Sequence, residues 1–98
     1  MTNDRQTART RFQISDAVRA SISNDGLVLL DLRGGVVLAS NSIGARIWQL
    51  AESRLDCREI ASRLARDYGL SIDRAEHDVT AFMAALEARG LVSTEPAC

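Results

Sequence analysis

Residues 26–50 read GLVLLDLRGGVVLASNSIGARIWQL. The turn sequence RGG (33–35) separates two apolar runs, which predicts a β-hairpin because glycine adopts the backbone angles of a tight turn. Asn41 then leads into a helical pattern that Ser42 can cap and that contains Trp48, the single tryptophan. A hairpin that continues directly into a helix leaves one strand with a free edge beside a hydrophobic surface. That arrangement suits binding of an extended peptide better than it suits chemistry.

Another strand is expected before this hairpin. Within Phe12–Ser23, apolar Val18, Ala20 and Ile22 alternate with polar residues. A period of two predicts a strand with one buried face. The sequence Asn-Asp-Gly (24–26) then supplies a turn, because these residue types tolerate positive φ.

The remaining two strands complete a three-stranded antiparallel meander. Residues 27–32 are almost continuously apolar, as expected for a central strand, and residues 36–39 form the last strand. That strand is an edge unless another element covers it. Three helices follow the sheet, so we expect an α+β fold.

Local signals mark the ends of the second and third helices. Asp56 and Glu59 have the spacing of a capping box, and Gly69 stands where a left-handed C-terminal cap is expected. Ser71 begins the longest helix and Gly90 ends it. The apolar positions of the three helices follow helical spacing: Ile43, Ile47, Trp48, Leu50 and Ala51; Ile60, Ala61, Leu64, Ala65 and Tyr68; Ile72, Ala75, Val79, Phe82, Met83 and Leu86.

The 98 residues fit one domain, with 46% hydrophobic and 26% charged residues. We interpret residues 1–11 as a flexible arm, 12–93 as the folded domain and 94–98 as a tail, with Leu91-Val92 folding back onto the core. No apolar run approaches the roughly 20 residues of a membrane helix, and no apolar segment follows the polar N-terminus to make a secretion signal. We therefore expect a cytoplasmic protein.

No residue pattern indicates catalysis. His77 is the only histidine, and its neighbour Asp78 points about 100° away on a helix, so a solvated histidine is expected. Cys57 lies at a helix start that could lower a thiol pKa, but with no histidine near it in sequence we favour an inert thiol. The glycines 34–35 lack a phosphate-loop motif around them. We predict no enzymatic activity, no metal site and no cofactor for this chain.

Nucleic-acid binding is the first alternative, because three helices beside a small sheet suggest a winged-helix DNA-binding regulator. The longest helix, however, sets Arg74 and Arg89 against four carboxylates, and the net charge of the chain is −1. A protein that contacts phosphates is expected to carry a basic surface. We therefore expect no nucleic-acid partner.

The sequences LVLLDLRGGVVLASNSIGARIWQL, REIASRLARDYG and HDVTAFMAALEARGLV together resemble the PqqD-like family. This family is named for the D protein of pyrroloquinoline quinone biosynthesis and includes the recognition elements for precursor peptides of ribosomal natural products, such as lasso peptides. The resemblance covers about Val18–Val92. It rests on the order and spacing of several pieces: Leu29-Leu30-Asp31, Asn41, Gly44-Ala45, Ile47-Trp48, Asp78-Val79, Phe82, Leu86 and Gly90-Leu91.

The resemblance implies a winged-helix-like domain that binds the leader segment of a precursor peptide. The leader would join the third strand as a further strand, in the cleft between that strand and the third helix. The partners would be the precursor peptide and a modifying enzyme such as a leader peptidase, a cyclase or a radical SAM enzyme, without a cofactor. The family commonly has an aromatic residue where this chain has Val36 or Val37, and a leucine where it has Ser40, so the apolar pockets are expected to differ in size.

The candidate peptide-binding residues combine the edge strand with one face of the longest helix: Val36, Val37, Leu38, Ala39, Ser40, Arg74, Asp78, Val79, Phe82 and Leu86. Two alternatives stay open for the helical residues. Val79, Phe82 and Leu86 can equally be core residues, and Arg74 and Asp78 can pair with each other at i and i+4. A structural alternative uses the same strand, because a free edge can also pair with a second copy and form a homodimer.

Overall fold

The computed structural model describes residues 11–35 and 37–95. Most of the expected arm (residues 1–10), part of the expected tail (96–98) and Val36 lie outside them. The elements, in chain order, are β1 (Arg11–Ile14), β2 (Val18–Ser23), β3 (Gly26–Asp31), β4 (Val37–Ser40), α2 (Ser42–Glu52), α3 (Cys57–Tyr68), α4 (Ile72–Ala88) and β5 (Val92–Glu95). The expected α+β architecture, an antiparallel sheet of order β2-β3-β4 followed by three helices, is confirmed.

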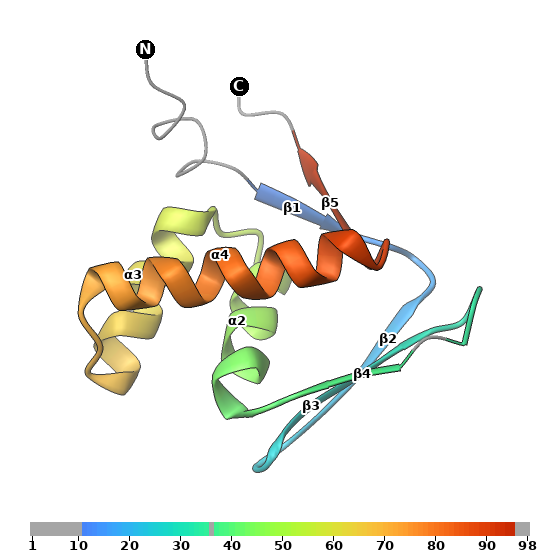
Figure 1. Ribbon diagram of the computed structural model, residues 1–98, viewed down its shortest axis with the longest axis horizontal. Coiled ribbons are helices and arrows are strands. Elements are labelled where there is room, and N and C mark those ends of the chain that lie inside the picture. The colour runs from blue at the N-terminus through green and yellow to red at the C-terminus, as the bar shows by residue number, and fades with distance from the viewer. Residues whose placement is uncertain (1–10, 36, 96–98) are drawn as a thin grey trace.

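Strand β3 is central, as predicted, but only one of its faces is covered. Leu27 and Leu29 point toward the helices and are buried, whereas Val28 and Leu30 are exposed on the other face. The helices all lie on one side of this sheet (Figure 1). The continuous apolar run therefore does not mean burial on both faces.

The predicted buried face of β2 is wrong in part. Val18 is buried, but Ala20 is exposed and Ile22 is 41% exposed. The reason is that α2 packs mainly against β3 and leaves β2 largely uncovered. Ile22 instead lines an open depression together with Ala45 and Tyr68.

A second, two-stranded sheet joins the two ends of the described chain, and the sequence analysis did not anticipate it. Strands β1 and β5 pair antiparallel, with Phe12 opposite Thr94, and they lie side by side in Figure 1. Phe12 is buried in this separate strand, so it does not belong to the same strand as Val18. The buried side chains of Leu91 and Val92 confirm that the chain folds back after α4.

The first helix is capped by Asn41 and not by Ser42. Asn41 has extended backbone angles, and its Oδ1 accepts a hydrogen bond from the Gly44 N–H at 3.0 Å. Ser42 is already the first residue of α2. Asparagine is among the preferred N-cap residues because its side chain satisfies a helix N–H that has no partner within the helix.

The signals at the other helix ends are confirmed. The Glu59 N–H donates to Asp56 Oδ1 at 2.8 Å, and the Asp56 N–H donates to Glu59 Oε1 at 2.9 Å, which completes the capping box. Gly69 has φ 66° at the C-terminal end of α3, and the Ser71 side chain caps α4.

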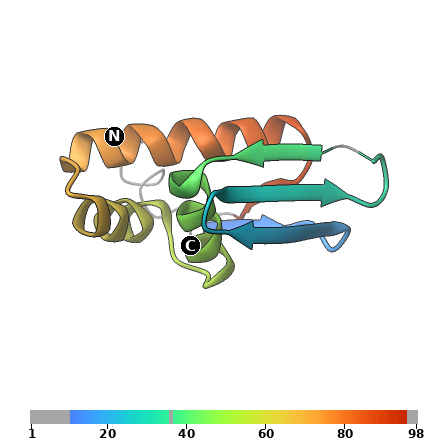
Figure 2. The same cartoon turned by 90° about the horizontal axis from the view of Figure 1, so that it is seen from below.

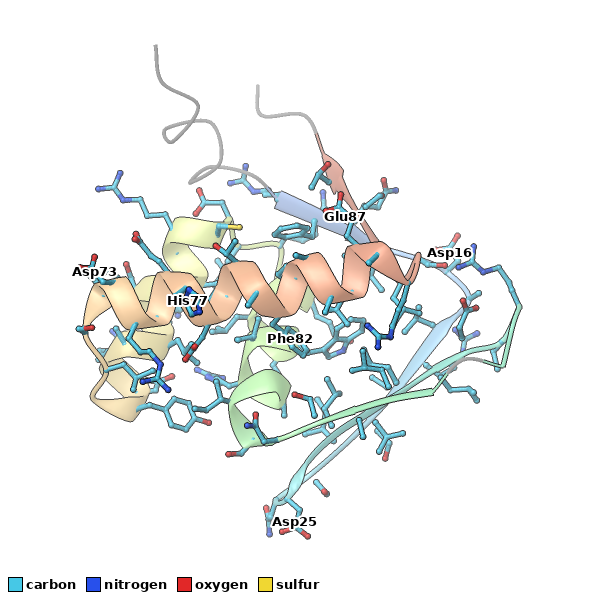
Figure 3. The ribbon with its side chains drawn as sticks, in the orientation of Figure 1. Asp16, Asp25, Asp73, His77, Phe82 and Glu87 are labelled. Atoms are coloured by element: carbon cyan, nitrogen blue, oxygen red, sulfur yellow. The ribbon has the colours of Figure 1, made fainter. Side chains whose placement is uncertain are left out.

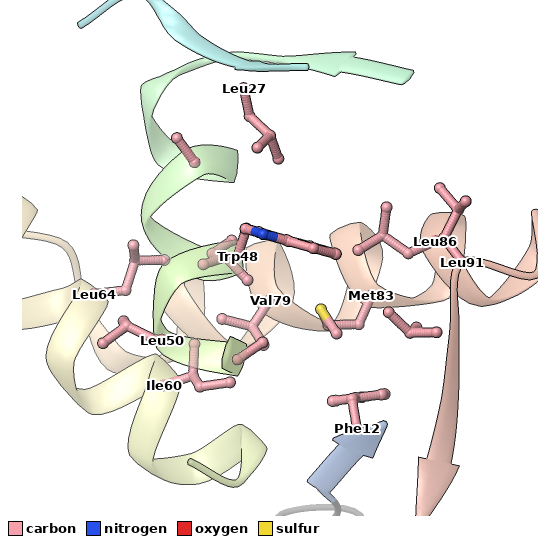
Figure 4. Packing of buried hydrophobic residues seen from close by; sticks show 14 of the residues in the cluster. Phe12, Leu27, Trp48, Leu50, Ile60, Leu64, Val79, Met83, Leu86 and Leu91 are labelled. Carbon is pink, nitrogen blue, oxygen red and sulfur yellow. The ribbon is translucent and has the colours of Figure 1, made fainter. Parts of the chain in front are cut away.

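One hydrophobic core joins the three helices, the covered face of the sheet and β1 (Figure 4). Trp48 lies at its centre and is 1% exposed, which confirms its assignment to the core. Tyr68 and Ile72, expected on the apolar helix faces, are exposed instead. They are the last residue of α3 and the first residue of α4, where the helices extend beyond the packed region.

Because Asn41 and Ser42 are adjacent and both exposed, they provide a matched test of the first cap. We expect Asn41→Ala to lower the free energy of unfolding by about 1 kcal/mol, since it removes the cap. Ser42→Ala should change it by less than about 0.5 kcal/mol, as is usual for surface substitutions. Urea unfolding followed by circular dichroism measures both. The reverse order of effects would mean that Ser42 is the cap.

Candidate functional site

Strand β4 has one free edge, and the register of the sheet determines which residues face it. The N–H of Leu32 donates to Ala17 O, on the β2 side of β3, while Asp31 O accepts from Gly35 N, on the β4 side. Backbone groups alternate sides along a strand. Leu27 and Leu29 therefore direct their backbone groups toward β4, where they oppose Ser40 and Leu38.

It follows that Leu38 and Ser40 use their backbone groups to bond β3, whereas Val37 and Ala39 direct theirs outward. Among the described residues, no backbone group pairs with the N–H or C=O of Ala39. The side chains alternate as well, across the faces of the sheet. Leu38 is partly buried against the core, and Ala39 is exposed on the opposite face.

The other edge of the sheet, along β2, is partly closed by its own chain. The Val18 N–H donates to Ser15 O at 3.1 Å, and Arg19 Nη1 donates to the Val18 carbonyl at 3.0 Å. Arg19 Nη1 also donates to Asp16 O. A charged side chain folded over an edge is a common way to block pairing with another chain. By the same alternation, Ala20 and Ile22 also direct their backbone groups away from β3, so among the described residues the β2 edge is closed only at Val18.

Phe82 on α4 lies close to the end of β4. A Cβ atom added at Gly44 would lie 3.0 Å from Phe82 Cε1 and would overlap the Ser40 side chain. The first turn of α2, the end of β4 and the middle of α4 therefore converge at Gly44. Phe82 is partly buried at the margin of the core, and Figure 3 shows it on the side of α4 that faces β4. Asp78 lies one turn before it on the same side of the helix.

The ten predicted site residues occupy different environments. Val79 (1% exposed) and Leu86 (0%) are core residues, which is the alternative that the sequence analysis left open for them. Phe82 and Leu38 are partly buried, and Arg74 and Ala39 are exposed. Arg74 Nε contacts Asp78 Oδ2 at 3.3 Å, so the open alternative in which these residues pair at i and i+4 is the one observed. Ser40 is half-buried, the side-chain surroundings of Val37 are not described, and Val36 lies outside the described residues.

Sequence reasoning missed the ion pair that connects this region to the end of α4. Asp31 is 5% exposed, and its carboxylate accepts hydrogen bonds from the backbone N–H, Nε and Nη2 of Arg33 at 3.0–3.1 Å. The side-chain hydrogen bonds from Arg33, and then its backbone N–H, hold the pKa of Asp31 below its ordinary 3.8. The available signal was an acidic residue at the end of an apolar strand.

The other residues considered for chemistry lie elsewhere. Burial, with a smaller contribution from Asp56, raises the pKa of the Cys57 thiol to about 11, so this cysteine is protonated and unreactive at neutral pH. His77 is exposed on α4. Among residues 11–35 and 37–95, no three His, Cys, Asp or Glu side chains are placed to hold a metal ion. In the same residues, no helix is long and apolar enough to cross a membrane.

Comparisons with known proteins agree with this architecture. The family model described as "Coenzyme PQQ synthesis protein D (PqqD)" matches residues 26–92. The structure titled "TbiB1 in Complex with the TbiA(beta) Leader Peptide" is similar with a TM-score of 0.76 and 32% identity, over 83% of this chain and 94% of that chain. A second, "Lasso peptide synthetase B1 complexed with the leader peptide", has a TM-score of 0.76 and 25% identity, over 85% of this chain and 98% of that chain. Curated protein sequences give no match.

Gly44 provides a test of the convergence of β4, α2 and α4. In a helix interior, Gly→Ala normally stabilises by about 1 kcal/mol. Here we expect Gly44→Ala to destabilise the fold, because the new methyl group would overlap Ser40 and press against Phe82. Gln49→Ala, an exposed change in the same helix, is the control. A higher melting temperature for Gly44→Ala in differential scanning calorimetry would show that the three segments are not in close contact.

Proposed function

The chain belongs to the PqqD family, and from this premise we propose that it binds the leader segment of a ribosomally made precursor peptide and presents it to a modifying enzyme. The leader adds to the free edge of β4 as a further strand. The modifying enzyme is a leader peptidase, a cyclase or a radical SAM enzyme, and this chain contributes recognition without catalysis or a cofactor.

The observation that supports leader binding most strongly is the pair of structural neighbours. Both are titled as complexes with a leader peptide, and each aligns with more than four-fifths of this chain. The site geometry is consistent with the same class of ligand, because β4 offers unpaired backbone groups beside the partly buried Phe82.

The position of β4, the strand of its sheet nearest to α4 (Figure 2), supports it as the binding edge, and the β2 edge is partly closed at Val18. At β2 the outward groups of Val18 are already bonded to Ser15 and Arg19. At β4 the outward N–H and C=O of Ala39 have no backbone partner among the described residues. An added strand gains main-chain hydrogen bonds at β4 that do not depend on its sequence.

Side chains of the leader then provide selectivity. Directly opposite residues of neighbouring strands point to the same face, so peptide residues opposite Leu38 and Ser40 point toward the helices. There they meet Phe82, and further along α4 the pair of exposed Arg74 and partly buried Asp78 can recognise a charged side chain. Val79 and Leu86 support this wall from the core and do not contact the peptide.

Two proline substitutions separate the free edge from the paired edge of β4. Proline removes a backbone N–H. At Ala39 this N–H points outward, so Ala39→Pro should weaken binding of a synthetic leader at least about tenfold, which corresponds to about 1.4 kcal/mol. The fold should persist, since no bond to β3 is lost. Leu38→Pro should lower both stability and binding, because it removes a bond to β3. Fluorescence anisotropy and thermal unfolding measure the two quantities.

The matched control is Ala39→Val, which retains the N–H and should bind the leader normally. The leader is taken from a precursor peptide encoded beside the gene for this chain. Sedimentation must give a 1:1 complex, because a second copy of the chain can compete for the same edge. Normal binding by a folded Ala39→Pro variant would contradict strand addition at β4.

A further inference from the structure

The pair of Asp31 and Arg33 lies at one end of the region proposed to hold the leader. Asp31 is the last residue of β3, and Arg33 is in the turn that leads into β4. Three hydrogen bonds from Arg33 satisfy both carboxylate oxygens of Asp31. Two of them come from the guanidinium, whose planar fork fixes its orientation.

The same guanidinium also reaches the end of α4. Arg33 Nη2 donates to the carbonyl oxygen of Gly90 at 3.0 Å. Gly90 follows the last turn of α4 with φ 73°, and its own N–H donates to Glu87 O. The hydrogen bond therefore connects the β3–β4 turn to a helix end that lies 57 residues away in sequence.

Strand β4 and helix α4 are the two walls between which the leader is proposed to lie, and Figure 2 shows β4 as the strand of its sheet nearest to α4. Near Ser40, the walls are fixed by the close approach of Gly44 and Phe82. Near Val37, where β4 begins, the hydrogen bond from Arg33 to Gly90 joins the turn to the helix.

We propose that Arg33, oriented by Asp31, is a positioning residue that sets the separation of β4 and α4 and thereby the affinity for the leader. This inference rests on the proposed function. Arg33 does not contact the peptide. It holds the start of β4 and the end of α4 at the separation that an added strand requires, so that the free protein is already arranged for binding.

The burial of Asp31 distinguishes this pair from an ordinary surface ion pair. The pair of Arg74 and Asp78, whose side chains are 64% and 23% exposed, is more open to solvent and contributes little to stability. Removing the Arg33 side chain, which is itself 59% exposed, would leave the Asp31 carboxylate, 7% exposed, without its charged partner, which is unfavourable. The lowered pKa of Asp31 agrees with this arrangement: the pair contributes above about pH 4 and is lost as the pH falls through the lowered pKa. It is therefore intact at neutral pH.

The experiment measures the separation without peptide and the binding kinetics with it. Nitroxide labels are attached at Gly34→Cys and Ala88→Cys, with Cys57 and Cys98 replaced. Dipolar broadening of their electron paramagnetic resonance spectrum reports the distance between the β3–β4 turn and the end of α4. In Arg33→Ala the broadening should fall, and the leader should dissociate about tenfold faster. Arg33→Lys retains the charge but cannot form the fork. Its dipolar broadening and its dissociation rate should both lie between those of Arg33→Ala and the unchanged protein.

Ile60→Val, a substitution in the buried part of α3, is the control for lost stability, because it removes a buried methyl group outside β4 and α4. It should leave both the broadening and the dissociation rate unchanged. If Arg33→Ala leaves the broadening unchanged, or speeds dissociation no more than Ile60→Val does, Arg33 is not a positioning residue. A protein that binds no leader at all would contradict the proposed function, and the label distances would still test the link between turn and helix.

Discussion

The hydrogen-bonded register between β3 and β4 is the constraint on which the rest of this structure depends. Leu38 opposes Leu29 and Ser40 opposes Leu27, so the backbone groups of these β4 residues are used within the sheet. Ala39 is left with its groups directed outward. A shift by one residue would exchange these roles and would also turn Leu38 to the exposed face. The free edge and the core are therefore specified by the same pairing.

Two close approaches connect this register to the helices. Gly26 at the start of β3 lies against the backbone of Ser40 and Asn41, where a side chain would not fit, so the chain can turn at once from β4 into α2. Gly44, in the first turn of that helix, then allows Ser40 and Phe82 to approach. At the other end, Arg33 joins the β3–β4 turn to the end of α4. The sheet edge and the helix are thus held at both ends.

Much of the fold could be predicted because it is encoded locally. The capping box of Asp56 and Glu59 and the glycine at position 69 depend only on residues within one turn of a helix. The pairing of β1 with β5 could not be predicted, because its two strands are short, lie at opposite ends of the described chain and carry no strong alternation. The exposure of Ile22 was missed for a related reason. Alternation shows that a strand has two different faces, but the packing of distant helices decides how much of each face is covered.

The candidate site was predictable as an edge strand, but not as a set of individual groups. Spacing alone placed Val79, Phe82 and Leu86 on one side of a helix, and only the packing separates the two buried residues from Phe82. Amide exchange at single residues in β4, followed by NMR with and without the leader peptide, tests strand addition most directly. The account predicts that Ala39 gains protection on binding, while Leu38 and Ser40, already bonded to β3, change little. Protection that appears along β2, or a leader complex in which the Ala39 amide continues to exchange freely, would contradict it.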